Sequence, residues 1–278
     1  MKLQILIGIE NEVQTVLERY QNDFSVVIMK DEADLITGLS EERQACENML
    51  LIAATDTTIA LGRQYAVATM AYMNPQIPGQ TYSGVDMIVE GFEEVDAGFL
   101  EKVYQRYHHI PWQIATTKRT IIRELSMDDL DALFALYKDE KLLEFMEDLY
   151  PYEEEKAFQQ AYIENMYRFY GYGMWLVFSK ETGELLGRAG LEHREYNGET
   201  ELELGYLIGT KYQGQGYATE ACDAILRIAK EITDFPRINC LIDAKNVSSI
   251  RLAEKLGFSH IEDMKMNGRK MSRYILAL

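Results

Sequence analysis

The chain has 278 residues, and its 28 Lys and Arg against 45 Asp and Glu give a formal net charge of −17 at pH 7. Residues 1 to 115 hold 7 basic and 17 acidic side chains, and the remainder holds 21 and 28, so both parts are acidic. This charge argues against general nucleic-acid binding, which needs a basic surface. It would favour cationic amines as substrates, or it serves solubility alone. The length predicts two domains.

Strands and helices alternate in the first part of the chain. Apolar and β-branched runs predict strands at 3–9, 24–29, 50–54, 66–72 and 85–89. Helices are predicted at 10–21, 41–48, 57–64 and 97–107. This alternation is typical of an open, mostly parallel α/β sheet, so the fold class is α/β with a Rossmann-like first domain spanning 1–115.

The third of these strands ends in a motif with a family likeness. Ala54-Thr55-Asp56-Thr57, followed by Ala66-Val67-Ala68-Thr69, resembles the last acidic motif of the haloacid-dehalogenase-like (HAD-like) phosphatases, where an Asp holds Mg²⁺. The family's early Asp-x-Asp nucleophile is missing, because the first strand ends Gly8-Ile9-Glu10-Asn11. A phosphoaspartate mechanism needs that carboxylate. We therefore interpret the domain as degenerate, with Asp56 as a helix N-terminal residue rather than a metal ligand.

The second part, 117–278, begins after Pro111 interrupts the pattern. It predicts a strand at 119–124, a helix at 127–138, a long helical region to about 170, and strands at 175–178, 185–194 and 200–208. Gly183 and the pair Asn197-Gly198 mark hairpin turns. These elements predict a mostly antiparallel α+β core.

A glycine-rich turn follows the last of these strands. Gly214 and Gly216 stand where a strand ends and a helix begins, with Glu220 in the first helical turn. Glycine permits the backbone angles of such a turn, and the free N–H groups at a helix start can bind phosphate. A short glycine motif is weak on its own, so a tight turn without a ligand is the alternative interpretation.

The surrounding motifs resemble the GNAT N-acetyltransferases, most closely the RimJ/RimL-like branch. The family pattern Arg/Gln-x-x-Gly-x-Gly/Ala reads here Lys211-Tyr212-Gln213-Gly214-Gln215-Gly216, with Lys at the first position. The continuation at 216–221, then Asn246, Ser249 and the Lys-Leu-Gly-Phe ending at 255–258, match the branch in order and separation. The resemblance covers about residues 117–278 and implies the GNAT fold with acetyl-CoA as co-substrate.

The resemblance also implies where acetyl-CoA binds. Backbone groups of Leu207 and Ile208 would bond the pantetheine arm as an added strand would, although both side chains are also core candidates. Asn246 would contact CoA, or else serve as a turn residue at a strand end. The pyrophosphate would be bound through the backbone of Gln213, Gly214, Gln215, Gly216, Tyr217, Ala218 and Thr219.

Catalytic residues are chosen from the chemistry of acetyl transfer. A carboxylate near the acceptor can remove the amine proton, and Glu203 is our candidate, with Glu201 on the same strand face as a rival. Ser249 would donate a hydrogen bond near the sulfur or cap a helix at 249–256, and we favour the cap. Ala253 occupies the position where many GNAT enzymes carry a Tyr acid, so the general acid is unassigned.

Two further groups are ambiguous. His193 is either an acceptor-side base or a structural strand residue. An aromatic run lines an acceptor pocket or packs a helix onto the sheet; its members are Tyr162, Tyr167, Phe169, Tyr170, Tyr172 and Trp175.

Cysteine content and hydropathy complete the expectations. Cys46, Cys222 and Cys240 are odd in number and widely spaced, which indicates buried thiols rather than disulfides or a metal site. The first apolar run is too short for a signal peptide, and no apolar stretch approaches 18 residues. We expect a cytoplasmic protein that binds no metal, membrane or nucleic acid. The sequence leaves open whether it forms a homodimer.

The sequence therefore predicts a two-domain N-acetyltransferase. It would transfer the acetyl group of acetyl-CoA to a primary amine of a small molecule, or to a peptide or protein N-terminus, by direct attack. A non-catalytic acyl-CoA-binding sensor is the alternative, motivated by Ala253 and the degenerate first domain. A hydrolase in the first domain is a third hypothesis, and the missing Asp-x-Asp argues against it.

Overall fold

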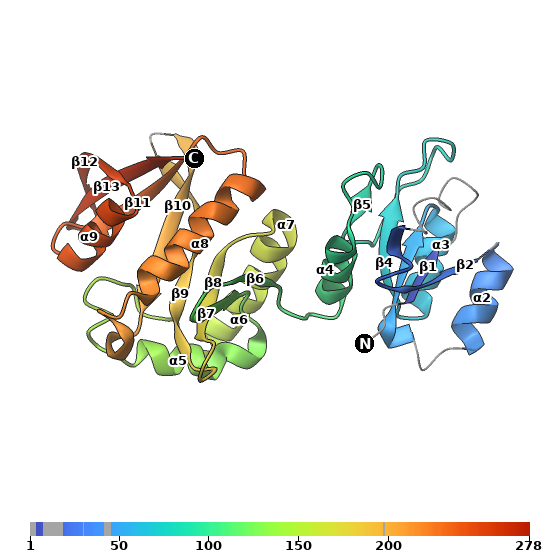
Figure 1. Cartoon of the computed structure of the whole chain (residues 1–278), viewed down its shortest axis with the longest axis horizontal. Coiled ribbons are helices and arrows are strands. Elements are labelled where there is room, and N and C mark those ends of the chain that lie inside the picture. The colour runs from blue at the N-terminus through green and yellow to red at the C-terminus, as the bar shows by residue number, and fades with distance from the viewer. Residues whose placement is uncertain (1–3, 8–18, 30, 42–45, 197) are drawn as a thin grey trace. The chain divides into compact units, whose positions relative to one another are not determined.

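The computed structural model describes residues 4–7, 19–29, 31–41, 46–196 and 198–278. The chain divides into two compact units, Met1–Trp112 (unit 1) and Gln113–Leu278 (unit 2), which we describe separately (Figure 1). The division falls a few residues before the expected boundary, because 113–116 form a strand that pairs within unit 2. None of the helices in the described ranges is both long and apolar enough to cross a bilayer.

Unit 1 contains a five-stranded parallel sheet in the order β2-β1-β3-β4-β5, as the alternating pattern predicts. Its central strand β3 is buried along its whole length, which explains its continuous apolar sequence. The strands are β1 (Gln4–Ile7), β2 (Ser25–Ile28), β3 (Met49–Ala53), β4 (Ala68–Tyr72) and β5 (Ile88–Val89), and the helices are α2 (Glu32–Glu41), α3 (Asp56–Gln64) and α4 (Ala97–Tyr107).

One helix of unit 1 differs from expectation. Residues 32–41 form α2, where no helix was predicted, whereas the described end of the predicted helix at 41–48 is a single 3₁₀ turn, Cys46–Asn48. Asp31 starts α2 by accepting from the Asp34 N–H at 2.8 Å. Leu35 and Leu39, one turn apart, are fully buried and hold the helix on the sheet. The predicted helix at 10–21 lies mostly outside the described residues.

Unit 2 is built on an eight-stranded sheet in the order β12-β13-β11-β10-β9-β8-β7-β6. Every neighbouring pair is antiparallel except β10 with β11, so the predicted mostly antiparallel core is confirmed. The strands are β6 (Gln113–Thr116), β7 (Thr120–Arg123), β8 (Met174–Ser179), β9 (Leu185–Tyr196), β10 (Glu199–Ile208), β11 (Arg237–Asp243), β12 (Ser259–Met266) and β13 (Arg269–Ala277).

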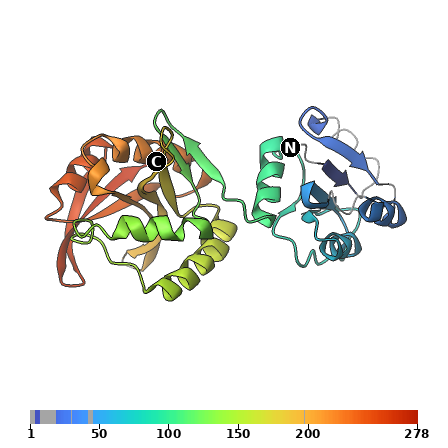
Figure 2. The same ribbon diagram turned by 90° about the horizontal axis from the view of Figure 1, so that it is seen from below.

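Helices cover this sheet and connect its parallel pair (Figure 2). The crossover from β10 to β11 is α8 (Tyr217–Ile232), and α9 (Val247–Lys255) follows β11. The predicted long helical region to residue 170 is wrong between α5 (Leu130–Tyr137) and α6 (Tyr152–Tyr162). That stretch forms turns, and Pro151 occupies the N-cap position of α6, because proline disfavours helical backbone in the residue before it. After α6 come a π-helical turn, Ile163–Tyr167, and the short α7 (Arg168–Tyr170).

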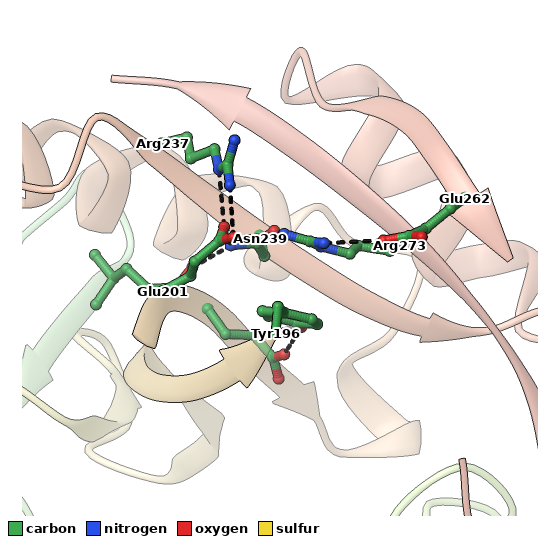
Figure 3. Close-up of polar contacts among 8 residues, drawn as sticks. Tyr196, Glu201, Arg237, Asn239, Glu262 and Arg273 are labelled. Atoms are coloured by element: carbon green, nitrogen blue, oxygen red, sulfur yellow. Dashed lines mark hydrogen bonds and ion pairs between the residues drawn. The ribbon is translucent and has the colours of Figure 1, made fainter. Parts of the chain in front are cut away.

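A buried ionic network lies where β10 and β11 are paired, centred on Glu201 (Figure 3). Arg237 donates to the Glu201 carboxylate from Nε at 2.8 Å and from Nη2 at 2.6 Å. Asn239 donates at 2.8 Å and Arg273 at 2.9 Å. These hydrogen bonds, those of Arg237 first, lower the pKa of Glu201 to about 2. A buried carboxylate is tolerated only with such partners.

Arg273 extends the network across the neighbouring strands. Its Nη1 donates to Glu262 on β12 at 2.9 Å, and its Nε donates to Asn239 at 2.8 Å. Its guanidinium also lies 3.9 Å from the ring centroid of Tyr196, whose hydroxyl donates to Glu203. Five strands, β9 to β13, are therefore tied together at one level of the sheet.

The network gives a stability prediction. Glu201→Gln should lower the free energy of unfolding by about 3 kcal/mol at pH 7, because Arg237 loses its carboxylate partner and the buried Arg273 keeps only the ion pair with Glu262. A carboxyl whose pKa is lower in the folded state stabilises that state fully at pH values above its unfolded pKa, which is near 4.5. This stabilisation is lost as the pH falls from 4.5 toward 2. The difference between wild type and variant, measured by urea denaturation, should therefore shrink below pH 4.5.

The exposed Glu195→Gln on β9 is the control for the loss of one charge. A Glu201→Gln loss equal to that of the control, or independent of pH, would contradict the proposed stabilisation.

Candidate active site

The parallel pair separates immediately after the ionic network. β10 and β11 pair at only two positions, Leu202 with Ile238 and Glu203 with Asn239. β10 then continues to Ile208 while paired with β9 on its other edge. From residue 204 to 208, the β10 edge that faced β11 has no strand beside it in the described sheet. Such an edge can take up an extended chain through backbone hydrogen bonds.

Alternation along β10 determines which residues face this open edge. The carbonyls of Leu204 and Ile208 point toward it, since they accept from Cys240 Sγ at 3.5 Å and from Gln213 Nε2 at 2.9 Å. Successive backbone groups point to opposite edges of a strand. The groups of Leu207 therefore face β9, and those of Tyr206 face the open edge. The Leu207 and Ile208 side chains are buried core residues.

The glycine-rich turn lies at the end of this strand. Gly214 and Gly216 have φ of +71° and +85°, which residues with a Cβ rarely adopt. Gly216 immediately precedes α8, so the free N–H groups of Tyr217, Ala218 and Thr219 form the helix start. The turn itself, 213–216, is exposed. This places a positively polarised helix end beside the open edge of β10.

Arg119 brings a guanidinium, paired with Glu220, to the turn, and sequence reasoning missed it. Its Nη1 donates to the carbonyl of Gln215 at 2.9 Å, and its Nε forms an ion pair with Glu220 at 2.7 Å. The guanidinium lies 4.4 Å from the ring centroid of Tyr217. The residue lies about 100 positions earlier, so no local motif could indicate it. Glu220, expected to favour the helix start, thus also anchors Arg119.

The start of α9 corrects the expected role of Ser249. Asn246 is the N-cap, because its Oδ1 accepts from the Ser249 N–H at 3.1 Å and from the Ser248 hydroxyl at 2.8 Å. The helix begins two residues earlier than expected, which makes Ser249 its third residue. The Ser249 carbonyl accepts from the Tyr206 hydroxyl at 3.0 Å, which joins β10 to α9.

The two cysteines near this site are buried free thiols, as expected. Burial raises the pKa of both Cys222 and Cys240, so neither is poised as a thiolate. Ala253, at the position of the missing Tyr acid, is fully buried. It supplies packing rather than a proton.

Glu203 lies at the last paired position before β10 leaves β11. Arg194 Nε forms an ion pair with its Oε2 at 2.7 Å, and the Tyr196 hydroxyl donates to the same carboxylate. Burial raises the pKa of Glu203. Glu201, the rival, occupies the same face but is taken up entirely by the network. The Glu203 carboxylate thus has fewer protein hydrogen-bond partners than that of Glu201.

The aromatic run divides between the core and the surface. Tyr167, Tyr172 and Trp175 are buried, whereas Phe169 is 79% exposed. Tyr162 lies beside the same sheet face as Glu203, because its hydroxyl donates to Glu192 on β9 at 3.1 Å. The π-helical turn that follows Tyr162 also places Tyr167 against Met174, whose carbonyl accepts from it.

His193 lies on the opposite face of the sheet from Glu203. In β9 it pairs with Leu202, so it alternates with Glu192 and Arg194. Its Nε2 is 2.7 Å from the Tyr172 hydroxyl, and its ring contacts Tyr170 edge-on. Burial lowers the pKa of His193. These contacts support the structural interpretation.

Asp56 of unit 1 is the first residue of α3, and Thr55 is the N-cap. The Asp56 carboxylate accepts from the N–H groups of Thr81 and Tyr82 at 2.9 and 2.8 Å. These bonds, that of Thr81 first, lower its pKa. Throughout the described ranges, no cluster of three or more His, Cys, Asp or Glu side chains could hold a metal ion.

Comparison with known proteins identifies similar sequences. The family model described as "Acetyltransferase (GNAT) domain" matches residues 119–259, about half of the chain. The uncharacterized protein YkkB of Bacillus subtilis is 33% identical over 105 residues, which span 38% of this chain and 61% of YkkB. YnaD of the same organism, named an uncharacterized N-acetyltransferase, is 29% identical over 51% of this chain and 80% of YnaD.

Solved structures share the fold of unit 2. A Bordetella pertussis protein assigned to the GNAT acetyltransferases has a TM-score of 0.52 and 25% identity, over 59% of this chain and 98% of that protein. RimL, titled a ribosomal L7/L12 alpha-N-protein acetyltransferase and solved with coenzyme A, has a TM-score of 0.53 and 20% identity, over 60% of this chain and 98% of RimL. The latter likeness concerns the fold alone.

The cap at Asn246 gives a prediction about its contribution to stability. Asn246→Ala should lower the free energy of unfolding by about 1 kcal/mol, because the Ser249 N–H loses its acceptor. Asn246→Ser should restore most of that stability, since serine also caps helices. Thermal and urea denaturation of the two variants measure the difference. Equal stability of all three proteins would show that the cap contributes nothing.

Proposed function

The chain belongs to the GNAT acetyltransferase family, and we propose that unit 2 transfers the acetyl group of acetyl-CoA to a primary amine. The amine would belong to a small molecule or to a peptide or protein N-terminus. The observation that carries the proposal is the separation of β10 from β11 directly beside the glycine-rich turn. Together they offer backbone groups for an extended pantetheine arm and N–H groups for its pyrophosphate.

Charge near the turn supports CoA binding despite the acidic chain. The Arg119 guanidinium, paired with Glu220 through Nε, stands beside Gly216 with its other nitrogens, and the N-terminus of α8 adds its dipole. The backbone of 213–219 would bind the pyrophosphate, and the open β10 edge, to which Tyr206 and Ile208 contribute, would bind the pantetheine. Asn246 would reach CoA from the start of α9 while capping that helix.

Acetyl transfer then needs few groups. The amine, after losing a proton to a carboxylate, attacks the thioester carbonyl carbon. The C–N bond forms, the C–S bond breaks, and the thiolate of CoA takes up a proton. Glu203 is one candidate for the carboxylate on the acceptor side, and the Ser249 hydroxyl is a hydrogen-bond donor for the sulfur. The general acid stays unassigned.

Unit 1 is proposed to be a degenerate HAD-like domain that does not catalyse a reaction of its own. Its parallel sheet and the position of Asp56 after β3 support the resemblance. The hydrogen bonds from Thr81 and Tyr82 occupy the Asp56 carboxylate, which supports a structural role for it. The segment Gly8-Ile9-Glu10-Asn11 lies outside the described residues.

Calorimetric titration with acetyl-CoA tests the binding site. Wild type should bind acetyl-CoA, and Gly214→Glu/Gly216→Glu should abolish binding, because two carboxylates at strained positions would repel the pyrophosphate. Gly198→Glu is the control, since that glycine also has a positive φ, +84°, in the exposed turn between β9 and β10 rather than in the glycine-rich turn. Absence of binding to folded wild type would refute the proposed function.

A panel of spermidine, kanamycin and a hexapeptide with a free N-terminus then tests turnover. Release of CoA with an amine, above the rate without it, is the expected result. Tight binding of acetyl-CoA without turnover of any amine would favour the acyl-CoA sensor instead.

A further inference from the structure

A second carboxylate, Glu192, lies directly opposite Glu203 across the β9–β10 pair. Side chains of directly opposed residues project from the same face with Cβ atoms about 5 Å apart. Two carboxylates at that distance repel each other, and nothing in the strand pairing requires the second. Glu203 lies at the last position before β10 leaves β11, where the thioester would bind, and Glu192 lies one strand further, on β9.

The two carboxylates have different partners. Glu203 is neutralised by the Arg194 ion pair and by the hydrogen bond from Tyr196, and its side chain is only 12% exposed. Glu192 is partly exposed. Within the described part of the chain, its carboxylate receives a hydrogen bond from the uncharged Tyr162 at 3.1 Å, and no ion pair joins it to a cation. The Glu192 carboxylate can therefore still accept hydrogen bonds from a positively charged ligand.

Tyr162 is held so that it orients this carboxylate. Its hydroxyl accepts from the Met174 N–H at 2.7 Å, which fixes the hydroxyl hydrogen toward Glu192. Tyr162 ends α6, and the π-helical turn begins at the next residue. Such turns widen a helix locally and often occur at functional sites.

We propose that Glu192, rather than Glu203, receives the ammonium group of the acceptor and takes its proton, with Tyr162 and the Glu203–Arg194 pair as positioning residues. The inference rests on the proposed function, because it names the acceptor side of the same site. The proton moves from the ammonium nitrogen to the Glu192 carboxylate. The neutral amine then attacks the thioester carbon, the C–S bond breaks, and the thiolate leaves. The acceptor class is a primary amine that is cationic at neutral pH.

Glu192→Gln tests this assignment, using the amine of the panel that wild type acetylates fastest. Its kcat/KM for that amine should fall about 100-fold, because glutamine cannot accept the proton. The KM for acetyl-CoA and the calorimetric affinity for acetyl-CoA should stay unchanged, a split that a merely structural effect would not produce. Glu192→Asp should recover part of the activity, since it keeps the charge.

Glu195→Gln is the matched control, because that exposed residue lies on the opposite face of the same strand. It should keep wild-type kinetics. A Glu192→Gln enzyme within twofold of wild type, together with a Glu203→Gln enzyme that loses activity, would overturn the inference and leave the transferase standing with Glu203 as its base. Wild type that binds acetyl-CoA but acetylates none of the amines would overturn the transferase itself.

Discussion

The buried carboxylate of Glu201 is the constraint on which the candidate site depends. Two strands that are to separate must first be held firmly together, or the whole sheet would open. Arg237, Asn239 and Arg273 supply four hydrogen bonds to this carboxylate at the one place where β10 and β11 are paired. The cost of burying a charge is offset by partners on β11 and on β13 beyond it. The strands can therefore separate after Glu203, two residues beyond Glu201, without destabilising the sheet.

The same network links stability to the site chemistry. Arg273 stacks on the Tyr196 ring, and the Tyr196 hydroxyl donates to Glu203. Through these two contacts the structural carboxylate and the site carboxylate share one connected set of groups. Among the described residues Arg194 forms its ion pair with Glu203, whereas the neighbouring carboxylate on β9 accepts a hydrogen bond from Tyr162. That neighbour is Glu192. The pairing register of β9 with β10 places it opposite Glu203, and no sequence motif indicates it.

Sequence reasoning found the local features and missed those that depend on distant partners. The glycine turn, the hairpins at Gly183 and Gly198, and the strands of unit 2 follow from short-range backbone rules. Serine is a good N-cap, so the sequence favours Ser249 as the cap of α9. Asn246 instead lies where the chain enters the helix, and its side chain accepts from the Ser249 N–H. The expected helical region to residue 170 is interrupted before α6, because Pro151 disfavours helical backbone in the residue that precedes it.

Sequence patterns could not predict contacts between residues that are distant in the chain and are brought together by the folded sheet. Arg119 reaches the glycine turn from β6–β7, and no spacing rule connects it to Gln215. Likewise, whether Leu207 or its neighbours face the open edge depends on which residues of β10 bond to β9. An alternating strand has two edges as well as two faces, and hydropathy reports only the faces. The edge that would bind an extended ligand therefore has to be read from hydrogen bonds, and on β10 these indicate residues 204, 206 and 208 rather than 207.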